Sequence, residues 1–339
     1  MAATDRPEIR SRASTGCRAA LPCIKARVAM EAEGGMAERG RIIALADGDL
    51  RAELWPAVGG SLGAFFAATG GGRIDFVRPA SDASVAREGP LAMGSFPLVP
   101  YSGRIRDGRF TFAGRAIALP LNFPPARHSI HGHGWQAPWS VAEAKANRAV
   151  LDYRHAADAW PFAYRSRQIV TLSPDRLTMR IELTNEGTQA MPAGIGHHPY
   201  FPRTPAARVT AAIERVWLAD DEVMPTSLVE PPPDRRLGEG VAVDRVALDS
   251  VFTGWSGRAL IEWPEHRASL AVAAAPPLRF LVVYTPPGQD FFCVEPVSHC
   301  PDAVNSAPRG VPDVGLVVLA PGETLAGEMV LEPRWERSR

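Results

Sequence analysis

The sequence predicts one large all-β domain, and three observations carry that prediction. From about residue 41 onward, short β-like runs follow one another with turn residues between them. Helical periodicity sustained over twelve or more residues is hard to find. Glycine and proline, 30 and 32 of the 339 residues, are spread along the chain without a period. Many short strands joined by turns indicate a sandwich or a barrel.

The expected strands begin with a hairpin of residues 41–45 and 50–55, whose connecting turn contains Gly48. A second hairpin is expected at residues 109–112, because Ala113-Gly114-Arg115 follows as a turn. Further strands are expected at residues 73–77, 149–154, 177–183, 259–263, 269–274, 279–284, 315–319 and 325–331. We find no internal repeat and no linker that separates two domains, so residues 39–339 are expected to form one β-sandwich domain.

The first 38 residues differ in composition from the rest of the chain. They are rich in arginine, alanine, glutamate and serine, and their apolar residues are scattered. The apolar stretch at residues 21–24 is followed at once by Lys25 and Arg27, which is not the pattern of a secretory signal peptide. We therefore expect residues 1–38 to be a disordered extension. Limited proteolysis tests this expectation, and a protected segment contradicts it.

Charge and cysteine content restrict the partners and the compartment. Lys plus Arg and Asp plus Glu are equal at 37 each, which gives no electrostatic reason to expect nucleic acid or an anionic membrane. The partner is expected to be a mostly neutral small molecule, and the oligomeric state stays open. Four cysteines in so long a chain are no disulfide framework, so a reducing, cytoplasmic location is expected. No run of eighteen apolar residues is present, so no membrane span is expected.

Three short segments contain the groups that acid–base chemistry needs. They are Arg127–Gly132, with its two histidines, His197-His198-Pro199-Tyr200-Phe201, and Val294-Glu295-Pro296, which the pattern places at a strand end. An imidazole and a carboxylate from these segments can lie on opposite sides of a small molecule. The aromatic face of Tyr200 suits a sugar ring or a packed core equally well. His155, His266 and His299 are expected to be solvated or structural.

Five landmarks in order resemble the aldose 1-epimerase (galactose mutarotase) family. They are Pro100–Ile105, Asn122–Gly132, His198–Phe201, Leu248-Asp249 and Val294–Pro296. The resemblance covers nearly the whole chain from about residue 41 and implies a β-supersandwich of stacked, mainly antiparallel sheets with an open sugar-binding face. It implies that Glu295 is the general base and His198 the general acid. The substrate-binding residues that it implies are Arg104, His131, Asp249 and Tyr200.

The match departs from the family pattern at one position and leaves two adjacent histidines for one role. The family usually has Asn-Arg where this chain has Gly103-Arg104, which affects the substrate preference more than the chemistry. Of the doublet His197-His198, the second is assigned the catalytic role because it directly precedes Pro-Tyr-Phe.

The implied reaction interconverts the α and β anomers of a free aldohexose. A base takes the proton of the C1 hydroxyl and an acid protonates the ring oxygen, so that the ring opens to an aldehyde and recloses. Glu295 has to be ionised and His198 protonated, which their ordinary pKa values permit near neutrality. No cofactor and no metal are expected, because Cys293, Cys300 and His299 lack the spacing of a structural zinc site.

Two other functions stay open. One is a hexose-6-phosphate 1-epimerase, which needs a basic cluster at the site mouth; Arg104, Arg106 and Arg127 are the candidates. The other is a non-catalytic carbohydrate-binding module on the same scaffold. Such a module does not need both Glu295 and His198, so their presence favours an enzyme.

Overall fold

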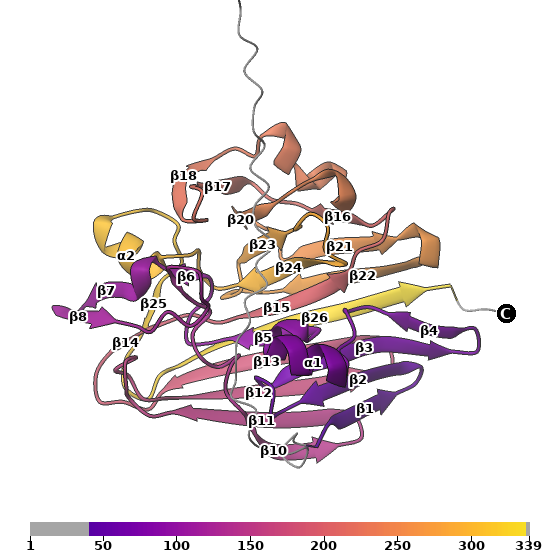
Figure 1. Cartoon of the computed structure of the whole chain (residues 1–339), viewed down its shortest axis with the longest axis horizontal. Coiled ribbons are helices and arrows are strands. Elements are labelled where there is room, and N and C mark those ends of the chain that lie inside the picture. The colour runs from indigo at the N-terminus through magenta and orange to yellow at the C-terminus, as the bar shows by residue number, and fades with distance from the viewer. Residues whose placement is uncertain (1–40, 337–339) are drawn as a thin grey trace, which may run out of the picture.

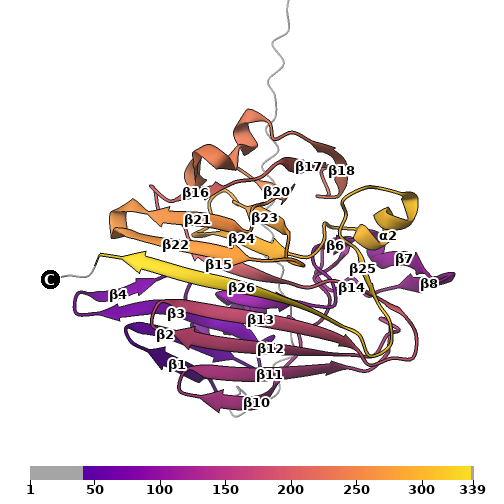
Figure 2. The same cartoon turned by 180° about the vertical axis from the view of Figure 1, so that it is seen from behind.

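A computed structural model describes residues 41–336, so the predicted extension at residues 1–38 lies outside the described residues. Two large antiparallel sheets dominate the described part, one of eleven strands and one of nine. Figures 1 and 2 show them from opposite sides. The prediction of an all-β fold is confirmed.

The eleven-stranded sheet carries the candidate site. Its neighbouring strands are, in order, β1 (Ile43–Asp47), β2 (Leu50–Trp55), β3 (Ser61–Thr69), β5 (Ser95–Leu98), β15 (Gly196–Pro202), β24 (Phe291–Val297), β23 (Phe280–Tyr284), β20 (Asp249–Thr253), β17 (Arg215–Ala219) and β18 (Pro225–Val229), with β4 (Gly72–Asp75) paired to β3. β15 and β24 therefore lie side by side in the middle of the sheet.

The nine-stranded sheet packs behind the first. Its order is β10 (Ser140–Lys145), β11 (Arg148–His155), β12 (Tyr164–Ser173), β13 (Arg176–Asn185), β26 (Thr324–Trp335), β22 (Ala268–Ala274), β21 (Arg258–Trp263), β16 (Arg208–Ala211) and β19 (Val241–Ala242). In Figure 2, β26, β13 and β12 are toward the viewer. Burial alternates along β12 and β13, so one face of this sheet meets the core and the other faces solvent.

The two sheets bury one continuous apolar core between them. Phe65, Phe201 and Phe292 of the first sheet belong to the same cluster as Ile181 and Leu331 of the second. β15 and β24 are buried on both faces, as is β5 beside them. A second apolar cluster, which includes Phe96, Trp135, Tyr200 and Trp217, covers their outer face.

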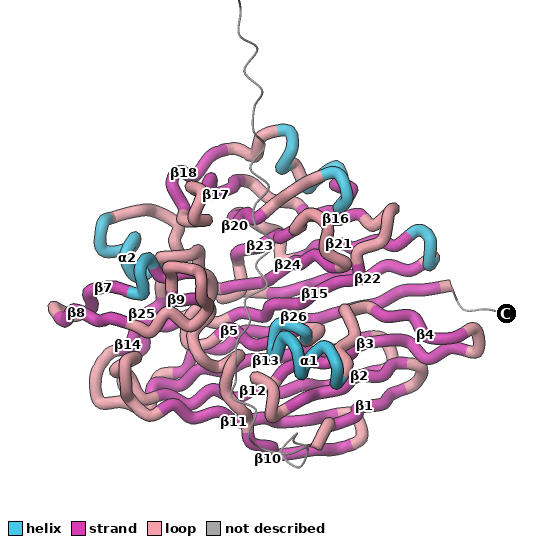
Figure 3. The backbone as a smooth tube through the Cα atoms, in the orientation of Figure 1, coloured by secondary structure: helices cyan, strands magenta, loops and turns pink. Residues whose placement is uncertain are grey.

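Loops and small elements supply the cover of that outer face. Figure 3 shows that much of the segment between β5 and β10 runs as loop. The short elements are β6 (Arg104–Ile105) paired with β9 (Ser129–Ile130), β7 (Arg109–Phe112) with β8 (Arg115–Ala118), β14 (Met191–Ala193) with β25 (Val317–Leu319), α1 (Asp82–Glu88), α2 (Ala303–Ser306), and 3-10 turns at Gly89–Ala92, Arg106–Gly108, Pro233–Arg235, Leu237–Glu239, Val243–Arg245, Pro264–His266 and Ala307–Arg309. None of the helices within residues 41–336 combines the length and the apolar character that crossing a bilayer requires.

Most of the predicted strands are confirmed. The two hairpins are β1–β2 and β7–β8, and Gly48 takes the left-handed conformation in the first turn. The strands expected between residues 149 and 331 match β11, β13, β21, β22, β23, β25 and β26 to within two residues at each end, except that β26 continues four residues further, to Trp335. The prediction was wrong on one point that concerns the site: Glu295 lies inside β24 and not at a strand end.

Candidate active site

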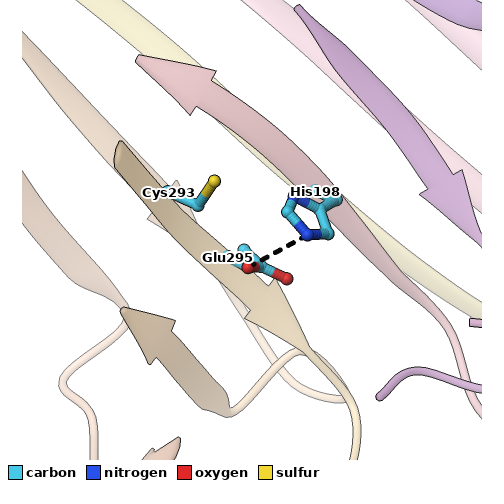
Figure 4. A group of neighbouring side chains, drawn as sticks. All are labelled: His198, Cys293 and Glu295. Carbon is cyan, nitrogen blue, oxygen red and sulfur yellow. Dashed lines mark ion pairs between the residues drawn. The ribbon is translucent and has the colours of Figure 1, made fainter. Parts of the chain in front are cut away.

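The site is centred on two neighbouring strands, β15 and β24. Their antiparallel ladder pairs Gly196 with Val297 and Tyr200 with Cys293. That register places His198 opposite Glu295, and Nε2 of His198 lies 3.4 Å from Oε1 of Glu295 (Figure 4). Because side chains two residues apart in a strand share a face, His198 and Tyr200 of β15 and Cys293 and Glu295 of β24 point to the same side of the sheet.

Three prolines interrupt the regular hydrogen bonding around this pair. Pro97, Pro199 and Pro296 lie in β5, β15 and β24, three adjacent strands of the sheet. Proline has no N–H to donate, so it is normally found at edges and bulges rather than in central strands. The β15–β24 ladder is correspondingly broken between its pairs at residues 196 and 200. His198 and Glu295 lie in that break.

His131 reaches the pair from the covering segment. Its ring lies 5.3 Å from the ring of His198, centroid to centroid. The neighbouring Gly132 has φ +67°, and a Cβ there would lie 2.0 Å from the carbonyl oxygen of Val99, so this position requires glycine. The side chain of Asn122 holds the segment by donating to the carbonyls of Ile130 and Gly132 and by accepting from the Ile130 N–H.

The hydrogen bonds of His131 define its tautomer. The backbone N–H of Gly103 donates to Nδ1 of His131 at 3.1 Å. Burial, with His198 and Arg104 acting in the same direction, lowers the pKa of His131 well below its usual value, so the ring is neutral. The proton is therefore on Nε2, which is left as a donor. The backbone N–H of Gly103 thus orients the histidine.

Arg104 and Asp249 form the next pair around the site. Nη2 of Arg104 lies 3.8 Å from Oδ2 of Asp249, the first residue of β20. Burial raises the pKa of Asp249, and the positive charge of Arg104 opposes that rise. Asp302 fixes the strand of Arg104, because its N–H donates to the Arg104 carbonyl and its carboxylate accepts from the Arg106 N–H.

Tyr200 packs against His198. Its ring stacks on that of His198 with centroids 4.7 Å apart and 13° between the planes. The guanidinium of Arg78 lies over the Tyr200 ring at 4.3 Å and over the Phe291 ring at 4.6 Å. Tyr200 is 5% exposed, so most of its surface is used in packing. From sequence, the Tyr200 ring suited sugar contact and core packing equally well. Its burial shows that its main role is packing.

Burial sets the protonation of the central pair. It lowers the pKa of His198 to about 3, and the charges of Arg78 and Arg104 act in the same direction. Burial also raises the pKa of Glu295 well above its usual range; Asp249 adds to this rise and Arg104 opposes it. Both charged forms are disfavoured: His198 is neutral near pH 7, and burial moves the equilibrium of Glu295 toward its protonated form. The expectation based on ordinary pKa values is therefore wrong for this buried pair.

The geometry of the pair also corrects the expected arrangement. His198 and Glu295 are in contact on one face of the sheet instead of facing each other across a space for a molecule. A molecule that contacts both His198 and Glu295 therefore has to do so through two neighbouring atoms. Among the described residues, the Glu295 carboxylate makes its ion-pair contact through Oε1 with His198, so the carboxylate has further lone pairs to offer.

Most of the remaining histidines are buried and packed against the fold. His197 is fully buried in the core between the sheets, and burial lowers its pKa to about 4. Neither of its ring nitrogens has a hydrogen bond of good geometry, although the Met179 backbone is close enough to oppose the shift in part. Nε2 of His299 accepts from the Ser102 N–H, and His155 stacks on His133. His266 is exposed.

The arginines proposed to hold a phosphate are paired with acids at the rim of the site. Arg106 lies 3.4 Å from Asp220 and 3.7 Å from Glu222. Arg127 lies 3.0 Å from Asp107 and 3.2 Å from the same Glu222. We call these five residues the rim cluster. It holds two cationic and three anionic side chains, so it offers no net positive charge.

Sequence reasoning did not identify Arg78, Asp302 or Cys293 as parts of the site. Each acts through contacts with residues distant in the sequence, and none lies in a recognisable local motif. A separate surface hollow of about 600 Å³ lies between Arg203 and the 287–290 loop. None of the predicted site residues lines it, so the candidate site remains at His198 and Glu295.

Comparisons with known proteins show a family and a fold for this chain. A sequence model of the family described as aldose 1-epimerase matches residues 43–332. The chain is 32% identical over 267 residues to the uncharacterized protein YphB of Escherichia coli (strain K12); the match covers 76% of this chain and 89% of YphB. The crystal structure of a candidate aldose 1-epimerase from Escherichia coli K12 is similar, with a TM-score of 0.78, 30% identity, and coverage of 87% of this chain and 99% of that one.

A galactose mutarotase-like protein from Clostridium acetobutylicum is similar in fold. The TM-score is 0.76 at 21% identity, with coverage of 87% of this chain and 95% of that one. At that identity the likeness concerns the fold alone. It confirms that the two sheets form the predicted β-supersandwich.

Proposed function

The chain belongs to the aldose 1-epimerase family, and from that premise we propose that it interconverts the α and β anomers of a free aldohexose. The enzyme is proposed to be an isomerase that works without a cofactor. A cytoplasmic setting is part of the proposal, in keeping with the unbridged thiols of Cys293 and Cys300.

The single observation that supports the proposal best is the contact between His198 and Glu295. The C1 hydroxyl oxygen and the ring oxygen of an aldopyranose are bonded to the same carbon, so they are close neighbours. Anomerisation removes a proton from the first oxygen and adds one to the second. Two proton-transfer groups whose reacting atoms lie 3.4 Å apart match that requirement.

The pair carries one proton throughout the proposed reaction. Ionised Glu295 takes the proton of the C1 hydroxyl, His198 gives its proton to the ring oxygen, and the bond between C1 and the ring oxygen breaks. The open aldehyde then faces protonated Glu295 and neutral His198. After rotation about the C1–C2 bond, both transfers run backward and close the ring on the other face of the aldehyde. Burial favours the proton distribution that follows ring opening, so it lowers the energy of the open-chain stage.

The surrounding residues are proposed to orient the sugar. Nε2–H of His131 and the guanidinium of Arg104 are donors to sugar oxygens, and the carboxylate of Asp249 accepts from a hydroxyl. Arg104 also stabilises the ionised form of Glu295, which is the form that starts ring opening. Tyr200 holds the plane of the His198 ring.

The rim cluster favours a free sugar over a sugar phosphate. A phosphate group needs unpaired guanidinium groups or a positive field, whereas Arg106 and Arg127 already bind three carboxylates. A non-catalytic binding module is also disfavoured. Burying a carboxyl and an imidazole in contact lowers the stability of the fold, and sugar binding alone does not require this pair.

Polarimetry on freshly dissolved sugars tests the proposal. In weakly catalytic buffer, the protein is expected to accelerate the relaxation of α-D-glucose or α-D-galactose to the final rotation reached without it. Acceleration with glucose 6-phosphate alone would assign the phosphate-specific activity instead. Sugar binding without any acceleration would assign the binding module.

A further inference from the structure

His198, Cys293 and Glu295 form a group of donors that anomerisation does not fully use. Cys293 lies two residues before Glu295 on β24, so both side chains leave the same face of the sheet. Figure 4 shows the thiol and the carboxylate on one strand and the imidazole on the neighbouring strand. One ligand atom from each of the three residues lies within 4.8 Å of the others. Within residues 41–336, no other group of three histidine, cysteine, aspartate or glutamate side chains has its ligand atoms this close together.

The separations suit a tetrahedral cation. With nitrogen and oxygen at about 2.0 Å and sulfur at about 2.3 Å from the metal, neighbouring donor atoms are about 3.3–3.5 Å apart. Nε2 of His198 and Oε1 of Glu295 are already 3.4 Å apart. The thiol is within 4.8 Å of the other donor atoms, so it has to approach by at most about 1.5 Å when the metal binds.

The chemistry of the donors selects the kind of cation. An imidazole nitrogen, a thiolate and a carboxylate are the ligands of zinc and of similar thiophilic divalent ions. Magnesium and calcium prefer oxygen ligands alone, so this group does not suit them. Three protein ligands leave the fourth tetrahedral position for water or chloride. Cys300, which is also buried, has no such partners and serves as a natural comparison.

We propose that His198, Cys293 and Glu295 bind one Zn²⁺ ion, and that the bound ion inhibits anomerisation. The sulfur of Cys293 bonds to the metal as its proton leaves to solvent. The imidazole and carboxylate lone pairs then hold the cation and no longer accept protons. The binding part rests on the donor geometry alone, whereas the inhibition part rests on the proposed function.

Cadmium is the probe for the binding part, because cadmium–thiolate bonds absorb in the ultraviolet. Full-length protein stripped with a chelator is titrated with Cd²⁺, and Zn²⁺ is then added to displace it. We expect one equivalent to bind with a thiolate band. Cys293→Ser is expected to abolish the band and to weaken zinc binding at least tenfold, because even changes outside the first coordination shell have effects of that size.

Matched cysteine variants control for the other thiols of the chain. Cys300→Ser tests the second buried cysteine, and the Cys17→Ser/Cys23→Ser double variant tests the two cysteines near the start of the chain. Both are expected to keep the band and the zinc affinity. His198→Asn provides a second ligand variant in case Cys293→Ser does not fold, as judged by circular dichroism.

The two parts of the proposal fail separately. A band that persists in both Cys293→Ser and His198→Asn, or no saturable binding in the wild type, overturns the site. Binding without loss of polarimetric activity overturns the inhibition. If the protein has no anomerase activity at all, the proposed function fails, and the cadmium titration still decides the site.

Discussion

His198 lies opposite Glu295 at the one place where the ladder between β15 and β24 is interrupted. The paired residues Gly196–Val297 and Tyr200–Cys293 flank the interruption and hold the register on both sides. Pro199 and Pro296 lie inside it and have no N–H to complete the ladder. The two side chains are thus positioned by strands, which are stiffer than loops, while the local backbone is free of regular pairing.

The two adjacent histidines should behave differently when they are replaced. His198→Asn removes the proton-transfer group and is expected to lower kcat by about 10²–10⁴-fold. His197→Leu changes a side chain in the core on the opposite face of β15 and should leave kcat within a few fold. Polarimetric rates, normalised to folded protein by circular dichroism, make the comparison. A reversed order would show that His197 is the catalytic residue.

His197 should make the fold sensitive to acid. Its pKa is about 4 in the fold, against 6.5 for an unperturbed histidine, so between these pH values the unfolded chain binds a proton that the folded chain does not. The free energy of unfolding therefore falls as the pH drops through this window, by about 3 kcal/mol from this residue when the pH reaches 4. Urea unfolding at pH 7.5 and 4.5 measures the effect.

His197→Leu is the control for that measurement. The other buried histidines stay in place, so the variant should lose less stability between the two pH values than the wild type, by about 2–3 kcal/mol. An equal loss in both proteins would mean that His197 does not titrate as its burial requires.

The catalytic rate should persist on the acid side of neutrality. The pair needs one proton, and a second proton has to go to His198, whose pKa burial lowers to about 3. At pH 5 the second proton is therefore still absent, and kcat/KM per folded molecule should equal its value at pH 7. A loss of activity with a midpoint near 6.5 would contradict the buried, neutral His198 described above.

The rim cluster should disfavour phosphorylated sugars. The carboxylate of Glu222 is shared by Arg106 and Arg127, so Glu222→Gln frees both guanidinium groups in part. We expect this variant to lower the KM for glucose 6-phosphate relative to glucose, and salt to weaken the effect. Asp234→Asn removes the same charge from an exposed carboxylate that pairs with Arg235, and it serves as the control. An equal effect of both variants would point to net charge instead of the rim.

Alternation and turn chemistry were enough to predict the regular strands. The hairpin of β1 and β2 follows from alternating residues around Gly48. β12 was missed because Ser166 and Gln168, on its inward face, are polar and yet fully buried. They are satisfied by the carbonyls of Glu182 and Gly60, partners that cannot be read from the local sequence. β3 was missed because both of its faces are buried, so its apolar residues do not alternate.

The site was predictable only in part. Proline is unusual in central strands, so the sequence did not predict that the segments with Pro199 and Pro296 form neighbouring strands. Glu295 and His198 were identified from the resemblance to a family. The direct contact of the pair, its altered pKa values, and the support from Arg78 and Asp302 depend on the tertiary fold. Residues nearly two hundred positions apart, such as Arg104 and Asp302, meet there without any local signal.

The most direct test of the central claim is the polarimetric rate of Glu295→Gln beside the wild type, on the same freshly dissolved aldohexose. Glutamine keeps the shape of the side chain but cannot take up the C1 hydroxyl proton. The account predicts wild-type acceleration of mutarotation, a loss of about 10²–10⁴-fold in the variant, and an unchanged circular dichroism spectrum. A folded Glu295→Gln protein with the full wild-type rate would contradict it.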